Sequence, residues 1–216
     1  MQYSAGLWSM TECIEALHFR GTGDVEAVSS AQMDVNGDIN ISWLPMPIKD
    51  QEGKPTGEWN TRGLRLPGGA GAPVVFGLHR KSVAYFPNHS KQLFVPKVNY
   101  ITGTRVYVTD EERRAQGLQP GPIIVVTNLC VMVMKSRGKW EVLSLHKGVS
   151  AEDVIANTGF PVEISKDCPT TEMPTKQELE LIKEIDPKGI RLLDFMSGKE
   201  RAGKLPAILQ EEWESV

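Results

Sequence analysis

The first 43 residues combine helix-type spacing of apolar side chains with a pattern typical of a hairpin. Apolar residues recur every three to four positions in residues 7–17, which predicts an amphipathic helix that ends near Gly21. Residues 25–33 are typical of a strand. Asn36-Gly37 favours a tight turn because both residues tolerate a positive φ, so we expect residues 39–43 to pair back.

The regular pattern then gives way to proline, glycine and charged residues. Residues 44–63 show no periodicity and predict a long surface loop, of the kind that serves as a lid or a partner contact. A glycine-rich turn over residues 66–73 leads into a short apolar stretch at residues 74–78. Residues 82–86 and 92–98 are each typical of a strand.

Strands and helices alternate in the remainder of the chain. A charged helical turn is expected at residues 110–116, and the apolar residues 123–134 predict a buried strand that pairs with residues 140–145. Two capping boxes predict helix starts, one at Ser150 and one at Thr175. The tail after Phe195 is polar, and we expect it to fray.

These elements indicate an α/β fold. Several hairpin-like pairs favour a mixed sheet over a purely parallel one. A chain of 216 residues is long enough to bury a core. We assign residues 1–195 to a single domain and residues 196–216 to a polar C-terminal tail.

Charge and targeting signals narrow the class of partner. The formal net charge of -3 gives no electrostatic reason to expect nucleic acid or an anionic membrane, although a local basic site could hold a small anion. No apolar run approaches the roughly 18 residues that span a bilayer, and the N-terminus lacks the basic start of a signal peptide. Three widely spaced cysteines form no disulfide framework, which fits the reducing cytoplasm.

The glycine cluster formed by Gly68, Gly69 and Gly71 is the first candidate site. Bare backbone amides could approach a thioester oxygen or a phosphate there, because no side chain would block the approach. The alternative is a loop with unusual backbone angles. The spacing matches neither a Walker loop nor a dinucleotide fingerprint.

The second candidate is the segment Asn88 to Phe94. His89 and Lys91 lie at the entrance of an expected strand, where they could contact phosphates or a substrate carboxylate. The alternative is a polar turn before a buried strand. The other three histidines have no neighbours at ligand spacing, so we expect no metal site. The helical glutamates suit solvated faces, and no Gly-x-Ser-x-Gly or Cys-His arrangement predicts a nucleophile.

Read in order, eight segments resemble the β-type subunits of family I coenzyme A transferases, and most of all the glutaconate CoA-transferase branch. The segments are Ala31–Asn40, Leu66–Gly71, His89–Phe94, Val98–Thr102, Gly121–Thr127, Leu143–Val149, Glu152–Phe160 and Leu179–Pro187.

The resemblance implies the three-layer, mixed-sheet α/β fold that this family shares with sugar-phosphate isomerases. It implies an α-type partner subunit, a site at their interface, and a CoA thioester as substrate rather than as a tightly bound cofactor. In the family a β-subunit glutamate attacks the thioester, which divides a difficult acyl transfer into easier steps. The resemblance assigns oxyanion binding to Gly68, Gly69 and Ala70, and substrate or CoA contacts to Gln32, His89 and Lys91.

The chain departs from the family where the nucleophile is expected. The family motif, Glu-Ser-Gly or Glu-Asn-Gly, lies some sixty residues before the stretch that begins here at Ala31, and the residues before Ala31 contain no such motif. Pro67 and Lys147 are further departures. We therefore expect a chain that is shortened at its N-terminus, or one from a branch whose β subunit has no nucleophile.

Three functions stay open at this point. The first is the β-type subunit of an acyl-CoA transferase, without a catalytic residue identified in this chain. The second is the β subunit of a ring-opening CoA-ester hydrolase of steroid degradation, a sister branch in which the α subunit carries the catalytic carboxylate. The third is a scaffold subunit that only stabilises its partner.

Overall fold

A computed structural model describes residues 9–13, 16 and 24–214 of the chain. The chain divides into two compact units, Met1–Thr171 and Glu172–Val216. The boundary that we assigned at residue 195 rested on the polarity of the tail and stays a prediction. Within the predicted N-terminal helix, the described part forms α1, Met10–Cys13, and the rest of that prediction lies outside the described residues.

The first unit contains a mixed six-stranded sheet, which confirms the predicted α/β class. The strand order is β1-β6-β8-β9-β10-β11, with β1, β6 and β8 mutually parallel, β9 antiparallel to both its neighbours, and β11 parallel to β10. The strands span Val25–Val28, Lys81–Phe86, Ile123–Thr127, Cys130–Ser136, Lys139–Leu145 and Glu163–Ile164.

A small second sheet has the order β3-β2-β7. Its strands are Ile39–Asn40, Gln32–Asp34 and Phe94–Val95. The predicted turn at Asn36-Gly37 joins β2 to β3, with Gly37 at a φ of +77°. The single strand expected at residues 25–33 is wrong, because β1 and β2 belong to different sheets.

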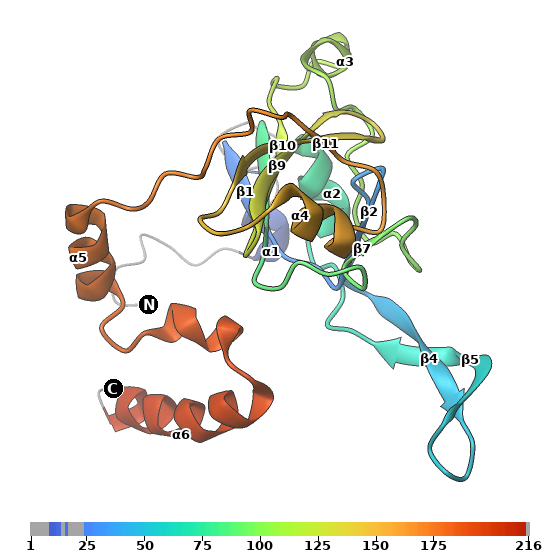
Figure 1. The fold of residues 1–216 in the computed structure, drawn as a ribbon, viewed down its shortest axis with the longest axis vertical. Coiled ribbons are helices and arrows are strands. Elements are labelled where there is room, and N and C mark those ends of the chain that lie inside the picture. The colour runs from blue at the N-terminus through green and yellow to red at the C-terminus, as the bar shows by residue number, and fades with distance from the viewer. Residues whose placement is uncertain (1–8, 14–15, 17–23, 215–216) are drawn as a thin grey trace. The chain divides into compact units, whose positions relative to one another are not determined.

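The predicted loop at residues 44–63 is also wrong. The structure has an antiparallel hairpin there, formed by β4 (Trp43–Lys49) and β5 (Pro55–Arg65). Figure 1 shows it as a long two-stranded ribbon that extends away from the other two sheets. Two register shifts interrupt its pairing, one between Leu44 and Met46 and one between Pro47 and Lys49. These irregularities interrupt the strict alternation of apolar and polar residues from which a strand is predicted.

Short helices complete the first unit. They are α2 (Ala72–Leu78), α3 (Asp110–Ala115) and α4 (Ala151–Asn157). The apolar stretch after the glycine-rich turn is therefore helical. The capping box predicted at Ser150 is confirmed, since Ser150 Oγ accepts from the Asp153 amide at 3.1 Å and the Asp153 carboxylate accepts from the Ser150 amide at 2.9 Å.

One hydrophobic core holds these elements together. Phe76 from α2 and Val154 from α4 are completely buried with residues of both sheets. Phe94 meets Phe86 and Phe160 edge to face, with ring centroids 5.6 and 6.1 Å apart. Trp140 is buried beside them and donates from Nε1 to the Val35 carbonyl at 2.7 Å.

Two buried arginines fix the turn between α2 and β6. Arg105 donates to the carbonyls of His79, Arg80 and Gly121, and Arg113 donates to those of Gly77, Leu78 and His79, all at 2.6–3.1 Å. The carbonyls of residues 77–80 lie at the C-terminal end of α2 and just after it, where intrahelical partners run out, and Gly121 lies shortly before β8. Burial lowers the pKa of Arg105 to about 9, which leaves its guanidinium charged at neutral pH.

The second unit is helical. It contains α5 (Lys176–Ile185), a 3-10 helix (Ile190–Phe195) and α6 (Gly198–Glu214). The capping box predicted at Thr175 is confirmed, with Glu178 as its partner. The expected frayed tail is wrong, because residues 198–214 form a helix.

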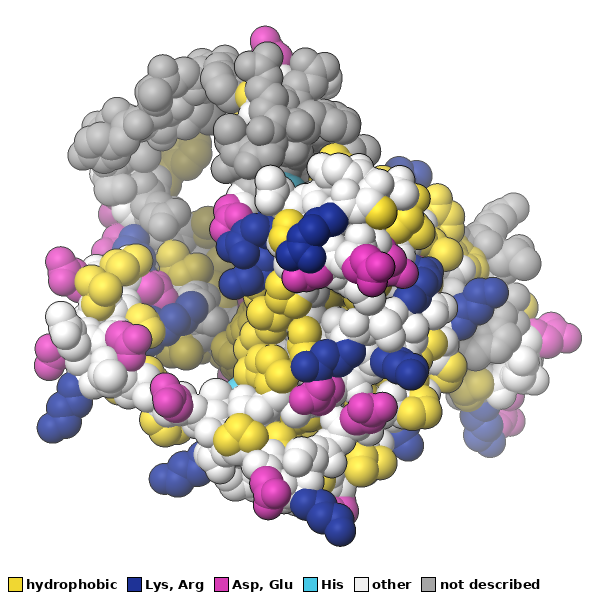
Figure 2. Space-filling view, turned by 90° about the horizontal axis from the view of Figure 1, so that it is seen from above, with side chains coloured by type: hydrophobic (Ala, Val, Ile, Leu, Met, Phe, Trp, Pro, Cys, Tyr) yellow, Lys and Arg dark blue, Asp and Glu magenta, His cyan; other side chains and the backbone are white. Residues whose placement is uncertain are grey.

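The surface carries charges of both signs. On the face drawn in Figure 2, the described basic and acidic side chains are interspersed with hydrophobic surface. In the part of the chain that the structure describes, no helix is both long and apolar enough to cross a membrane.

Candidate functional site

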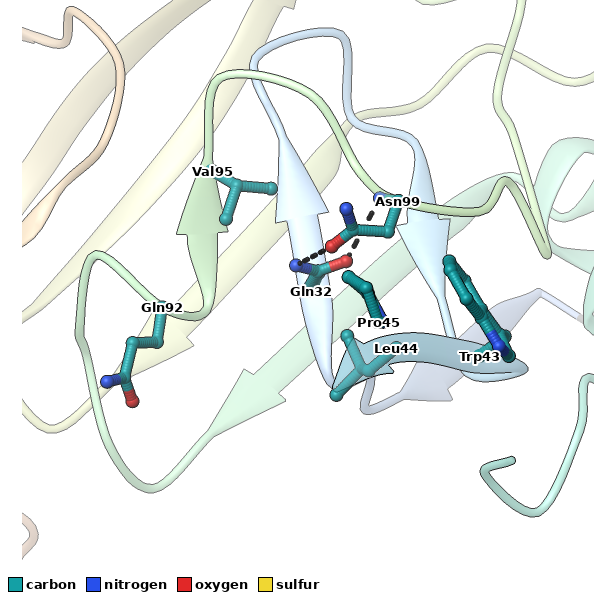
Figure 3. A pocket seen from close by; sticks show the side chains of 7 residues that line it. All are labelled: Gln32, Trp43, Leu44, Pro45, Gln92, Val95 and Asn99. Atoms are coloured by element: carbon teal, nitrogen blue, oxygen red, sulfur yellow. Dashed lines mark hydrogen bonds between the residues drawn. The ribbon is translucent and has the colours of Figure 1, made fainter. Parts of the chain in front are cut away.

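A pocket of about 630 Å³ lies beside the small second sheet (Figure 3). β2 contributes Gln32, and β7 contributes Val95. Gln92 lies just before β7 and Asn99 lies after it. The start of β4 supplies the remaining wall, formed by Trp43, Leu44 and Pro45. The lining is apolar apart from three carboxamide side chains, and it includes no ionisable group.

A second pocket of about 490 Å³ shares Trp43 with the first. Its other lining residues are Ser42, Arg65, Leu66, Gly68 and Tyr100. Arg65 is exposed and supplies a positive charge, while Ser42 and Tyr100 add hydroxyl groups. The two pockets therefore flank one indole ring and differ in character, the first neutral and the second cationic. For brevity we call them the amide pocket and the glycine-loop pocket.

The glycine-rich segment lies between β5 and α2 and has the unusual backbone that one interpretation expected. Gly68 has a φ of +97° and Ala70 a φ of +44°. Gly68 donates its amide to the Ile41 carbonyl at 2.9 Å, so that amide is occupied. Among the described residues, no acceptor is assigned to the amides of Gly69 and Ala70.

Gly69 occupies a position where any larger residue would collide. A Cβ there would overlap with Cγ2 of Thr102 and lie 3.1 Å from Cδ of Pro73. The hydroxyl of Thr102 in turn accepts from the Ile41 amide at 2.9 Å and bonds to Ser42 Oγ at 2.7 Å. The segments around Ile41, Gly69 and Thr102 therefore fix one another beneath the glycine-loop pocket.

Gln32 lies in the amide pocket, as part of a bonded set of carboxamides. Its Nε2 donates to the side-chain Oδ1 of Asn99 at 2.7 Å, and its Oε1 accepts from the backbone amide of Asn99 at 3.1 Å (Figure 3). Asn40, which is completely buried, also donates to Gln32 Oε1, at 2.9 Å. The side chain of Gln32 thus makes three hydrogen bonds to two residues, Asn40 and Asn99, and these bonds hold the pocket wall together.

The structure corrects the expected role of His89. Its side chain is 4% exposed, and its ring nitrogens lie 3.0 Å from Thr127 Oγ1 and 2.9 Å from Thr158 Oγ1. Burial lowers the pKa of His89 to about 4, so the ring is neutral at pH 7. A neutral ring with both nitrogens bonded has no polar atom to offer a phosphate, and His89 is a core residue.

Lys91 is exposed in the turn before β7, and its neighbour Gln92 lines the amide pocket. The structure therefore separates the two residues of this motif, with His89 inside and Lys91 at the surface. Trp43, Asn99 and Tyr100 were not predicted as site residues. Asn99 and Tyr100 do fall in a segment that carried the family resemblance, which was the available signal for them.

Ionisable residues of the described part of the chain do not gather into a metal site. In the described ranges, no group of three or more His, Cys, Asp or Glu side chains could hold an ion. Cys130, the most buried cysteine, has its pKa raised to about 11 by burial, so its thiol is protonated at neutral pH.

Comparison with known proteins identifies the relatives of this chain. No protein-family model matches it. Over 168 residues, 77% of the chain, it is 32% identical to the B-type subunit of the 3-oxoadipate CoA-transferase of Pseudomonas knackmussii, and the match covers 60% of that protein. This chain is a homologue of CoA-transferase B subunits.

Two further relatives refine that relation. The B-type subunit of the glutaconate CoA-transferase of Acidaminococcus fermentans is 27% identical over 74% of the chain and 56% of its own length. The crystal structure of that enzyme matches the fold with a TM-score of 0.62 at 21% identity, over 85% of this chain and 68% of the matched one. The cholesterol ring-cleaving hydrolase IpdB subunit of Rhodococcus jostii is 34% identical over 48% of the chain and 41% of its own length.

The chain spans about 40–60% of the length of these curated relatives. The resemblance to the CoA-transferase B branch is confirmed, and the hydrolase subunit is a sister relative. Some segments that carried the resemblance contribute to the two pockets, since Gln32, Gly68 and Asn99 each belong to one such segment, while Trp43 and Arg65 do not.

Proposed function

We propose that this chain is the B-type subunit of a heteromeric acyl-CoA transferase, which moves CoA between an acyl-CoA and a carboxylic acid. The observation that carries the proposal is the pair of pockets that meet at Trp43, one beside the glycine loop and one lined by carboxamides. The glycine loop would receive the thioester carbonyl, and the adjoining pocket would receive a neutral part of the same ligand. CoA itself would be a substrate and not a resident cofactor.

Within this proposal, the oxyanion role falls on the amides of Gly69 and Ala70. The amide of Gly68 already donates to Ile41, so its contribution would be the open backbone that lets a ligand approach. Amides that point at a developing negative charge stabilise it without reorganisation at the moment of reaction. Lys91 would contribute its charge at the pocket rim.

The carboxylate that the reaction needs would come from outside these two pockets, because none of their lining residues is acidic. We propose that an A-type subunit completes the site. The exposed apolar side chains of the second unit, including Ile185, Phe195 and Trp213, support the need for a partner surface. The same lack of an acidic residue favours the hydrolase as second candidate, with its catalytic carboxylate on the partner.

Activity of the assembled complex separates these functions. The chain would be co-expressed with an A-type subunit, purified as a complex, and assayed with acyl-CoA in the presence and absence of an acceptor carboxylic acid. Exchange that requires the acceptor supports the transferase. Hydrolysis without an acceptor supports the ring-opening type of enzyme, and a stable complex without turnover supports the scaffold.

A variant of the glycine loop tests the site itself. Gly68→Val places a side chain in open space of the glycine-loop pocket, where no atom lies within 4 Å of the new Cβ. Gly53→Val is a matched control, because Gly53 also has a positive φ and open surroundings but lies in the turn between β4 and β5. We expect turnover to fall in Gly68→Val alone. Equal turnover in the two variants would contradict the proposed role of the loop.

A further inference from the structure

Backbone amides fix the orientation of three linked carboxamides, two of which, Gln32 and Asn99, line the amide pocket. The third, Asn40, is completely buried. Oδ1 of Asn40 accepts from the backbone amides of Ser42 at 3.1 Å and Trp43 at 3.2 Å. Because a backbone amide can only donate, the atom that faces them must be the oxygen. Nδ2 of Asn40 is therefore the atom that lies 2.6 Å from the Trp43 carbonyl and 2.9 Å from Gln32.

The orientation of the Asn40 carboxamide in turn determines that of Gln32. Oε1 of Gln32 faces two donors, Nδ2 of Asn40 and the backbone amide of Asn99 at 3.1 Å. This leaves Nε2 of Gln32 to donate to Oδ1 of Asn99 at 2.7 Å. An exchange of oxygen and nitrogen on Gln32 would set donors against donors, so its orientation is determined.

Asn99 stands at the end of this series, which we call the amide relay (Asn40, Gln32 and Asn99). Its Oδ1 is held by Gln32, so its Nδ2 must face away from Gln32, as Figure 3 shows. Among the described residues, no acceptor is assigned to this Nδ2. Asn99 thus presents a donor of fixed direction from the wall of the amide pocket.

The lining of the amide pocket indicates what this donor would bind. Trp43, Leu44, Pro45 and Val95 are apolar, and no lining residue carries a charge. A carboxylate or phosphate would lose its hydration there without an opposite charge in return. A neutral carbonyl oxygen needs only one or two donors and loses far less on burial.

We propose that Nδ2 of Asn99 binds a neutral carbonyl oxygen of the ligand, and that Gln32 is the positioning residue that keeps this donor aimed at it. The proposal rests on the proposed function, because an acyl-CoA is the ligand considered. Such an oxygen has two sources in an acyl-CoA, a keto group of the acyl chain or an amide of the pantetheine arm. The chemistry is the same in both cases.

Two isosteric variants test the relay. Asn99→Asp keeps the oxygen that accepts from Gln32 and replaces Nδ2 with an acceptor. Gln32→Glu places an oxygen opposite Oδ1 of Asn99, so the Asn99 carboxamide turns over and presents its own oxygen to the pocket. Asn157→Asp is the control, since it makes the same chemical change on a half-buried residue at the end of α4 that does not line the pocket.

Uncharged probes measure binding without the CoA phosphates. Pantetheine, butyryl-pantetheine and acetoacetyl-pantetheine would be titrated into the full chain, with ¹⁵N NMR following the side-chain amide of Asn99. We expect that signal to shift in the wild type. We expect affinity to fall about tenfold in Asn99→Asp, which is about 1.4 kcal/mol, and about fivefold in Gln32→Glu, with Asn157→Asp unchanged.

The pattern across probes identifies the oxygen. If the variants weaken acetoacetyl-pantetheine alone, the partner is the keto group, and if they weaken all three equally, it is a pantetheine amide. The inference is overturned if the variants bind every probe as tightly as the wild type, or if no probe shifts the Asn99 signal. CoA exchange by the assembled complex is a separate readout, so turnover without a shift would remove the inference and leave the proposed function standing. A shift of the Asn99 signal without exchange or hydrolysis would remove the proposed function and leave the inference standing.

Discussion

The two units of the chain differ in how far they bury their apolar side chains. The first unit gathers aromatic and aliphatic residues from two sheets and two helices into one core. The second unit is about as regular in backbone, yet none of the residues of α5 or of the 3-10 helix is buried. Trp213 in α6 is 86% exposed and Ile185 in α5 is 73% exposed.

Regular secondary structure and a closed core therefore have separate causes. Caps and helix propensity can specify a short helix locally, but most helical stability in proteins comes from packing an apolar face. The first unit has that packing within itself. The helices of the second unit have local signals at their starts and leave apolar side chains at the surface, so their full stability requires another surface.

The largest expected effect contrasts two phenylalanines. Phe94 is completely buried, whereas Phe195 is 56% exposed. Phe94→Ala should lower the free energy of unfolding by about 3–5 kcal/mol, because it removes a buried ring and leaves a cavity. Phe195→Ala should lower it by less than about 1 kcal/mol. Urea denaturation of the full chain, followed by circular dichroism, measures both. Equal losses would mean that Phe195 is buried in solution.

A neighbouring pair of arginines gives the next contrast, within the first unit. Arg113→Met should cost about 2–4 kcal/mol, because it leaves the carbonyls of Gly77 and Leu78 without this donor. Arg114 is the matched control, since it is largely exposed and pairs only with Asp110 at 3.6 Å. Arg114→Met should cost less than about 0.5 kcal/mol. The same denaturation experiment compares them, and similar costs would refute the structural role of Arg113.

Acid should weaken the first unit through His89. Its folded pKa of about 4 lies below the ordinary value of 6.5, so the unfolded chain takes up a proton first. The stability associated with a neutral His89 is complete above pH 6.5 and is lost as the pH falls toward 4. Relative to His89→Gln, we expect the wild type to lose about 2 kcal/mol between pH 7.5 and pH 5. This comparison cancels the contribution of Glu26, whose pKa is raised by burial to about 7 and which acts in the opposite direction. An identical pH profile in the variant would exclude His89 as the cause.

The second unit should not share this response, because residues 172–216 contain no histidine. Its capping glutamate, Glu178, has a pKa lowered by hydrogen bonds from Thr175. The folded carboxylate therefore stays ionised below its ordinary pKa, and its contribution is lost only as the pH falls through that lower value. Helicity of α5 should be constant from pH 7.5 to pH 5.

The smallest effect compares two capping boxes of the same geometry. Ser150→Ala removes the cap of α4, and Thr175→Ala removes that of α5. Each should cost about 1 kcal/mol. In the first unit this cost should lower the stability of the whole cooperative core. In the second it should only increase local amide hydrogen exchange over residues 176–185, without change in the exchange of β8 or β9.

Local signals account for the elements that the sequence predicted well. The turn at Asn36-Gly37 and the caps at Ser150 and Thr175 depend on a few adjacent residues, and the structure has all three. The apolar run at residues 123–134 was misjudged in extent, since β8 ends at Thr127 and β9 begins at Cys130 on the same sheet. A turn of only two residues within an apolar run hardly changes the hydropathy pattern, because the strands on both sides of it are buried.

The candidate site was predictable in part for a similar reason. Composition alone revealed the glycine segment, because only an unusual backbone requires several glycines in succession. The burial of His89 was not predictable, since it depends on hydroxyls that lie 38 and 69 residues away. The amide relay likewise joins residues up to 67 positions apart, and no local pattern predicts such a network.

The turn held by Arg105 and Arg113 has a consequence for the order of folding. The carbonyls after α2 receive their donors from side chains that follow them by 25 to 36 residues. During synthesis this corner therefore stays incomplete until the ribosome has released Arg113, and closing so long a loop carries an entropic cost before any bond is gained. We therefore expect the junction of α2 with β6 to be completed only after residues 105–113 have been synthesised.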